Sequence, residues 1–200
     1  MRFGSFEIVK TGGPSAGKTE IATTLADYVI ETVCPELDAS DPDKYKKLIA
    51  HVSRKTAEMV VKWQLIGWCH GVLNTDNMSV AGITIDYGPF GFIDRFDPEF
   101  VCNASDNNGR YSYSNQPTIC KWNLFKWTQM LDHLVTKEDA KQIIDANFDS
   151  TFFQKIVDGA RAKMGLAMPL DGDQELYESL LQAIGYHLSK NIFFLNFVFA

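Results

Sequence analysis

The chain has 200 residues, of which 46% are hydrophobic and 22% charged, and its formal net charge is −6. This length suits one domain or a large piece of one, and the hydrophobic share is sufficient for a core. The acidic balance argues against a nucleic-acid-binding protein, which would normally carry a basic stripe. No apolar run is long enough to suggest a membrane span either.

The N-terminal part of the chain contains a candidate phosphate-binding loop. Residues 2–9 alternate in character and are expected to form a strand or an extended segment. Gly12 to Thr19, GGPSAGKT, then matches the P-loop pattern GxxxxGK[ST], and a helix is expected from about 20 to 33. A P-loop NTPase also needs a parallel sheet of alternating strands and helices, whereas the rest of this chain is mostly helical in pattern. The alternative is a glycine-rich surface loop before a helix.

A long helical stretch follows from about 42 to 69, with a break near Val52 as an open alternative. Its second half, TAEMVVKWQLIGWC, is apolar on more than one face and is therefore expected to be buried. Such a helix would carry His70 directly into the segment that follows. We expect His70 to act as a hydrogen-bonding scaffold residue rather than as a base.

The segment from His70 to Gly88, HGVLNTDNMSVAGITIDYG, contains the most informative pattern. Asp76 and Asn77 are adjacent, and the alternation over 78–85 predicts a short β-hairpin that returns Asp86 towards them. Oxygen ligands from two segments suit Mg²⁺, which usually takes its remaining ligands from phosphate and water. The alternative is a buried hairpin in which the two carboxylates cap turns.

Protein kinases provide a template for this segment, because they carry HRDxxxxN, then a strand, then DFG. His70 and Asn77 have the spacing of the first motif, and Asp86-Tyr87-Gly88 takes the place of the second. The position of the usual catalytic aspartate is Val72, and the nearest carboxylate is Asp76. The metal-binding half of a kinase site is therefore present, and the base is displaced.

The remainder is expected to be an irregular segment followed by helices. The irregular segment, rich in aromatic, glycine and Asn/Asp/Ser residues, occupies the position of a kinase activation segment and covers 89–117. The helices are expected at 118–135, at 139–163 after a capping-box-like Thr136, and at 171–188.

Several motifs closely resemble the selenoprotein O (SelO, YdiU) family: HGVLNTDNMS, TIDYGPFGF, DRFDP, VCNASDNNGRY, CKWNL and, at the start, RFGSFE. The resemblance runs from Arg2 to about Leu180, and its motifs are long and specific. Members of that family are pseudokinases that transfer AMP from ATP to Ser, Thr or Tyr hydroxyls of proteins. The resemblance implies an α+β, predominantly helical fold like a protein-kinase C-lobe, formed by residues 1–190. The apolar tail 191–200 departs from the family pattern.

The resemblance also implies roles for individual residues. Asn77 and Asp86 would bind Mg²⁺, Asp86 and Arg2 would contact the phosphates of ATP, and Asp76 would accept the proton of the target hydroxyl. The implied partners are ATP and protein substrates, without nucleic acid or a membrane span. A solvated terminal arginine is the alternative interpretation of Arg2.

The resemblance places Met1 after the N-lobe, so the chain is expected to be a fragment of a longer enzyme whose own activity is open. Animal members resemble mitochondrial proteins, but no targeting peptide is recognisable here, and a cytosolic location stays open. Two other functions remain alternatives. One is a P-loop NTPase that uses Gly12–Thr19, and the other is a non-catalytic kinase-like nucleotide-binding module.

Overall fold

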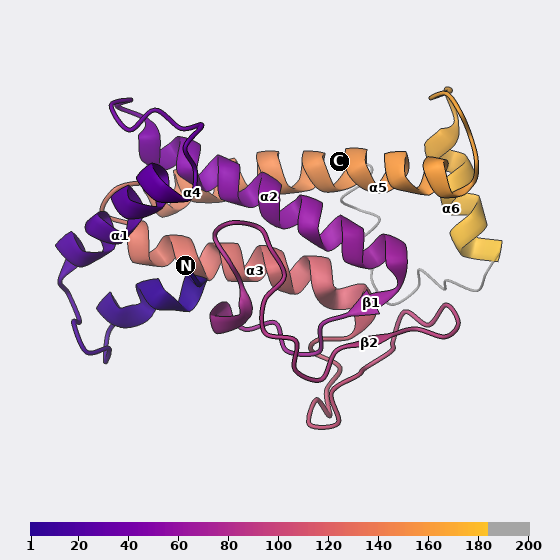
Figure 1. The fold of residues 1–200 in the computed structure, drawn as a ribbon, viewed down its shortest axis with the longest axis horizontal. Coiled ribbons are helices and arrows are strands. Elements are labelled where there is room, and N and C mark those ends of the chain that lie inside the picture. The colour runs from indigo at the N-terminus through magenta and orange to yellow at the C-terminus, as the bar shows by residue number, and fades with distance from the viewer. Residues whose placement is uncertain (184–200) are drawn as a thin grey trace.

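A long helix, α2 (Lys44–Ile66), crosses the middle of the protein and contacts α3, α4 and α5 (Figure 1). The computed structural model describes residues 1–183. Within them no helix is both long and apolar enough to cross a membrane. The other elements, in chain order, are the 3-10 helix η1 (Phe3–Val9), α1 (Thr19–Thr32), β1 (Trp68–Cys69), the 3-10 helix η2 (Thr75–Asn77), β2 (Gly91–Phe92), the 3-10 helix η3 (Tyr113–Asn115), α3 (Gln116–Thr128), the 3-10 helix η4 (Gln129–Leu131), α4 (Lys137–Ile144), the π-helix η5 (Asp145–Asp149), α5 (Ser150–Lys163) and α6 (Asp173–Ala183).

Helix α2 forms one continuous element because its buried positions follow the helical period along its whole length. Val52 is fully buried within this stripe and lies mid-helix, so the alternative of a break there is wrong. The helix ends at Gly67, which adopts a left-handed conformation with φ 69° and donates its backbone N–H to the carbonyl of Trp63. The C-terminal end of α2 therefore delivers the chain to β1 and His70.

The N-terminal segment is a 3-10 helix, and the expected strand is wrong. Phe3, Phe6 and Val9 recur every third residue, which matches three residues per turn and places them on one side of η1, where all are buried. Trp127 of α3 stacks on Phe3, with ring centroids 5.3 Å apart, and meets the edge of Phe6 at 5.7 Å. Arg2 alone retains strand-like pairing, as an isolated bridge.

The small sheet is antiparallel, as expected, but it lies elsewhere in the sequence. Strand β1 pairs with β2, and the segment 70–90 lies between these two strands in the sequence. Residues 78–85 do not form a hairpin. The Met78 carbonyl instead accepts the Phe3 N–H at 2.8 Å. Ile83 is 57% exposed, so the alternation over 78–85 has no core against which a strand face could be buried.

The C-terminal half follows the expected helices with shifted boundaries. The segment before α3 is irregular apart from β2 and η3, and α3 ends at Thr128 with η4 after it rather than at 135. The helix expected at 139–163 begins two residues earlier and contains the π-helix η5 between α4 and α5. Thr136 caps α4 by accepting the Asp139 N–H at 3.1 Å, as predicted. The tail 191–200 and the boundary at 190 lie outside the described residues.

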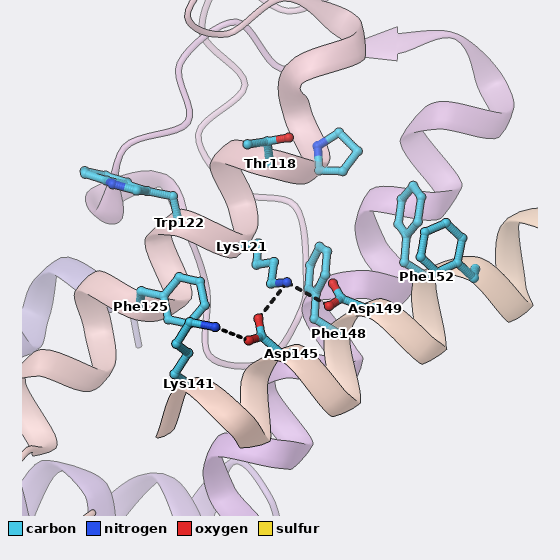
Figure 2. Close-up of a pocket in the computed structure, with 11 residues that line it drawn as sticks. Thr118, Lys121, Trp122, Phe125, Lys141, Asp145, Phe148, Asp149 and Phe152 are labelled. Atoms are coloured by element: carbon cyan, nitrogen blue, oxygen red, sulfur yellow. Dashed lines mark hydrogen bonds and ion pairs between the residues drawn. The ribbon is translucent and has the colours of Figure 1, made fainter. Parts of the chain in front are cut away.

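An ionic cluster ties α3 to the α4–η5–α5 rod (Figure 2). Lys121 Nζ lies 2.7 Å from a carboxylate oxygen of Asp145 and 2.7 Å from one of Asp149, and Lys141 Nζ contacts Asp145 at 2.6 Å. Burial raises the pKa of Asp149 to about 6, despite its hydrogen bond to Lys121. Burial opposes ionisation of Asp145 too, but its hydrogen bonds to both lysines lower its pKa.

We expect the Asp149 carboxylate to make folding stability depend on pH. Its pKa is about 6 in the folded chain, whereas the ordinary value, expected in the unfolded chain, is 3.8. Between these two values the folded state binds a proton that the unfolded state has lost, so stability falls as pH rises through this window. Chemical denaturation of the wild type and Asp149→Asn at several pH values would measure this. Relative to the variant, the wild type should lose up to about 3 kcal/mol between pH ~4 and ~7. A constant difference would contradict the pKa assignment.

Candidate active site

Main-chain pairing joins the N-terminal segment to the loop that carries Asp76 and Asn77. Arg2 forms an antiparallel bridge with Ser79, and the Val80 N–H donates to the Met1 carbonyl at 3.0 Å. These bonds fix the start of the chain beside the loop over 70–80. The predicted site residues Arg2, Asp76 and Asn77 are therefore neighbours in space although they lie far apart in sequence.

His70 links this loop to the segment that carries Asp86. The His70 ring is buried, and its Nε2 lies 2.9 Å from the Ile85 carbonyl, while Nδ1 accepts the Val72 N–H at 3.4 Å. This arrangement assigns the neutral tautomer with the proton on Nε2. Burial lowers the pKa of His70, which favours the same neutral form. His70 thus serves as a scaffold residue, as the sequence predicted.

Asn77 is oriented by its own loop. Its backbone N–H donates to the side-chain oxygen of Asn74 at 3.1 Å, and its side-chain Nδ2 donates to the Val72 carbonyl at 3.0 Å. Because the amide nitrogen donates to its own loop, the amide oxygen Oδ1 faces Arg2. The side chain of Asn123 on α3 supports the loop from behind through a 2.8 Å bond to the Leu73 carbonyl.

Asp86 has an unusual backbone conformation. It is the single non-glycine residue with positive φ in the described part of the chain, at 60°. The left-handed region is uncommon for residues with a Cβ, and such strain gathers at functional sites. Two bonds hold the preceding residues in place: His70 to the Ile85 carbonyl, and Trp63 Nε1 to the Thr84 hydroxyl at 2.9 Å. The Asp86 side chain, 43% exposed, consequently points to the loop and to solvent rather than into the core.

The Arg2 guanidinium lies between the oxygens that were predicted to bind metal. Its Nη1 is 2.8 Å from the Asp76 carbonyl, 3.2 Å from Asp86 Oδ2 and, at the limit of a hydrogen bond, 3.5 Å from Asn77 Oδ1. A cationic group therefore already stands where the carboxylate and amide oxygens converge. Mg²⁺ needs few protein oxygens when phosphate and water supply the rest, so this donor set fits it. Across residues 1–183 no cluster of three or more His, Cys, Asp or Glu side chains suits a metal.

The Asp76 carboxylate rests against η1, a contact the sequence did not predict. A Cβ added at Gly4 would come within 2.0 Å of Asp76 Oδ1, so the absence of a side chain at Gly4 makes room for this carboxylate. Next to it, the Thr75 hydroxyl donates to Glu7. Hydrogen bonds to Lys10 and Thr75 lower the pKa of Glu7 although its partial burial opposes them. The motif RFGSFE contains both Gly4 and Glu7, but nothing in the sequence showed which loop they contact.

The glycine-rich segment from Gly12 to Thr19 lacks the features of a phosphate-binding loop. The residues before it form η1 rather than a strand, and the sheet found among residues 1–183 is two-stranded and antiparallel. A P-loop presents its amides to phosphate. Here the amides already donate to backbone carbonyls of this segment, of Lys10 and of η1; the donors are Gly13, Ser15, Ala16, Gly17, Lys18 and Thr19. The surface-loop interpretation therefore fits the structure.

We expect Gly4→Ala to displace the Asp76 carboxylate with little loss of stability, because the new methyl group would meet the flexible end of that side chain. NMR chemical shifts of Asp76 and chemical denaturation would measure both effects, and Ser5→Ala on the same helix is the matched control. The free energy of unfolding should change by less than about 1 kcal/mol. Unchanged Asp76 shifts in Gly4→Ala would contradict the contact.

Comparison with known proteins identifies the family. The chain is 46% identical over 196 residues to human "Protein adenylyltransferase SelO, mitochondrial", an alignment that covers 92% of this chain and 29% of that protein. It is 42% identical over 212 residues to "Protein nucleotidyltransferase YdiU" of Burkholderia multivorans, covering 98% and 39% respectively. The chain thus spans roughly a third of the length of these relatives. The family described as Protein adenylyltransferase SelO matches residues 1–198, and the chain belongs to it, as its motifs predicted.

Proposed function

We propose that the protein to which this chain belongs is a protein adenylyltransferase that moves AMP from ATP to a Ser, Thr or Tyr hydroxyl. The observation that carries this proposal is the convergence of Asp76, Asn77 and Asp86 around the Arg2 guanidinium. The names of the relatives, an adenylyltransferase and a nucleotidyltransferase, support the same reaction. Since the chain spans only part of those relatives, the reaction is assigned to the longer protein.

In the proposed reaction, the hydroxyl oxygen of the target bonds to the α-phosphorus of ATP. The bond between that phosphorus and the bridging oxygen of pyrophosphate breaks, and pyrophosphate leaves. Asp76 accepts the hydroxyl proton. Its carboxylate is exposed at the loop surface beside Gly4, where an incoming side chain could reach it. General-base help of this kind is typically worth about 10²–10⁴ in rate.

We assign Asn77 and Asp86 as the residues that would hold Mg²⁺. Bound there, the ion would neutralise negative charge on the phosphates and orient them. Arg2 would contribute a second positive charge to the phosphates, and its side chain is 47% exposed. The exchange of Arg2 for a metal ion would keep the charge of the Asp86 carboxylate compensated in both states.

We also propose that residues 1–183 correspond to a kinase-like C-lobe. A long buried helix, α2, leads through the short strand β1 into the loop with Asn77, and a second segment then returns Asp86 to that loop. This order matches the kinase arrangement of catalytic loop followed by the DFG aspartate. The names of the human, mouse and zebrafish relatives describe them as mitochondrial. The compartment of this chain stays a prediction.

Removal of the Asp76 carboxylate should abolish transfer without unfolding the protein. In a chain of the relatives' full length, Asp76→Ala should lower the rate of AMP transfer by about 10²–10⁴ because the base is lost. The assay follows ATP labelled at the α-phosphate or at the γ-phosphate onto protein. Asp171→Ala, a substitution of an exposed aspartate far along the chain, is the control and should transfer normally.

The same two labels separate the competing functions. Label from the α-phosphate on protein means adenylylation, and label from the γ-phosphate means kinase activity. Neither label, with ATP still bound, would favour the non-catalytic binding module. Wild-type transfer by Asp76→Ala would show that the base has been misassigned.

Nucleotide binding should depend on Asp86 and not on Lys18. Lys18 is exposed, and the amides around it are already bonded within the chain, so Lys18→Ala should leave the Kd for Mg·ATP within about twofold of wild type. Asp86→Ala removes a metal ligand and should weaken binding by roughly tenfold or more. Isothermal titration of the full-length protein measures both. The reverse pattern would favour the P-loop NTPase.

A further inference from the structure

The segment from Arg2 to Glu7 makes three separate contacts with Asp76 and with Thr75, the residue before it. The Arg2 guanidinium donates to the Asp76 carbonyl at 2.8 Å, and the Asp76 carboxylate fills the space that a side chain at Gly4 would need. One 3-10 turn further along η1, Glu7 Oε1 accepts the Thr75 hydroxyl at 2.5 Å. Of these three contacts, the last joins two side chains, so it depends on the identity of both residues.

The Glu7 carboxylate has both of its oxygens engaged and is held in the ionised form. Oε1 accepts the Thr75 hydroxyl, and Oε2 forms an ion pair with Lys10. Partial burial opposes ionisation, but the hydrogen bonds with Lys10 and Thr75, together with the charges of Lys10 and Lys126, lower the pKa of Glu7. A carboxylate with a lowered pKa takes up a proton poorly. Glu7 is therefore suited to anchoring the loop rather than to acting as a second general base.

The Asp76 carboxylate depends on such an anchor more than Asn77 does. Thr75 begins η2, the short 3-10 helix that carries both residues. The Asn77 side chain is oriented from within the loop, by its bond to the Val72 carbonyl. The Asp76 carboxylate, in contrast, accepts no hydrogen bond from any residue in the range 1–183. Its position is consequently set by where the backbone of η2 lies against η1.

We propose that Glu7 is a positioning residue for the base Asp76 and acts through the hydroxyl of Thr75. This inference rests on the proposed function, because it concerns the same carboxylate. A general base must lie within hydrogen-bond reach of the proton that it removes. A displacement of about 1 Å can cost roughly 10²-fold in rate. Loss of the bond between Glu7 and Thr75 would release η2 from η1 at the residue next to the base.

The same contacts predict that Glu7 affects the transfer step and not the binding of ATP. Asn77 is held by the loop itself, and the segment before Asp86 is held by the bond between His70 and the Ile85 carbonyl. The residues assigned to Mg²⁺ thus have supports that do not include Glu7. A loss of kcat without a rise in KM for ATP would be specific to the position of the base.

The test measures AMP transfer by the full-length protein, with ATP labelled at the α-phosphate. We expect Glu7→Ala and Thr75→Val each to lower kcat by about ten- to a hundredfold. KM for ATP should stay within about twofold of wild type. Thr75→Ser retains the hydroxyl and should restore kcat to within about fivefold of wild type, less than the worth of one hydrogen bond to a charged group. Glu31→Ala, which removes the same charge at an exposed position of α1, is the matched control and should transfer normally.

Two further measurements show whether Glu7 acts through Asp76. In a protein that already carries Asp76→Ala, the additional change Glu7→Ala should cause no further loss of transfer, since no base is left to position. In the 200-residue chain, Glu7→Ala should shift the NMR resonances of Asp76, a result that requires no activity. Circular dichroism of each variant checks the fold, and Thr75→Val provides the same test from the other partner if Glu7→Ala unfolds.

The outcomes that contradict the positioning role differ from those that contradict the proposed function. Normal kcat in Glu7→Ala, with transfer lost in Asp76→Ala, would overturn the positioning role alone. Equal losses from Glu7→Ala with and without the Asp76 carboxylate would reveal a general structural role and would overturn it too. Normal transfer by Asp76→Ala would instead remove the base from the proposed function, and the positioning role with it.

Discussion

The packing of η1 against Trp127 is the constraint on which the candidate site depends. Phe3 and Phe6 are fully buried against that ring, and burial of each side chain contributes about 1.5–3 kcal/mol. This energy exceeds what the few main-chain bonds of a terminal segment would provide, since each contributes about 1 kcal/mol net. It therefore fixes Arg2 and Gly4, the neighbours of Phe3, beside the loop that carries Asp76. Without it, only main-chain bonds and the contacts of Arg2 itself would hold this segment beside the loop.

A second constraint determines where Asp86 lies. The left-handed backbone at Asp86 costs on the order of 1–3 kcal/mol and persists only when its surroundings enforce it. The buried, neutral ring of His70 does so by bonding to the Ile85 carbonyl, and Trp63 bonds to the Thr84 hydroxyl. Both side chains come from α2 or from the residues just after it. The continuous helix α2 thus helps to determine where the Asp86 carboxylate lies.

The sequence predicted these features unequally, for physical reasons. Helices α1, α2 and α5 were recognisable because helical periodicity is a local property of the chain. The residues of the site were identified through motif order, and their proximity in space depended on contacts between distant segments. The segment over 2–9 was misassigned because eight residues are too few to distinguish the three-residue repeat of a 3-10 helix from the two-residue alternation of a strand. Trp127, whose ring favours the 3-10 helix, lies far away in sequence. The hairpin over 78–85 failed likewise, since Met78 found its partner at Phe3.

The ionic cluster between α3 and the α4–η5–α5 rod is hard to explain by stability alone. Lys121, Asp145 and Asp149 lose part of their hydration, and burial raises the pKa of Asp149 even though Lys121 contacts it. Replacement of buried ion pairs by apolar residues is often neutral or stabilising, so such a cluster is weak evidence for a contribution to folding. The π-helix η5 runs from Asp145 to Asp149, and this irregular turn sets how both carboxylates approach Lys121; π-helical turns are frequent at functional sites. The cluster and η5 together therefore fix how α3 meets the α4–η5–α5 rod, more than they add to the free energy of folding.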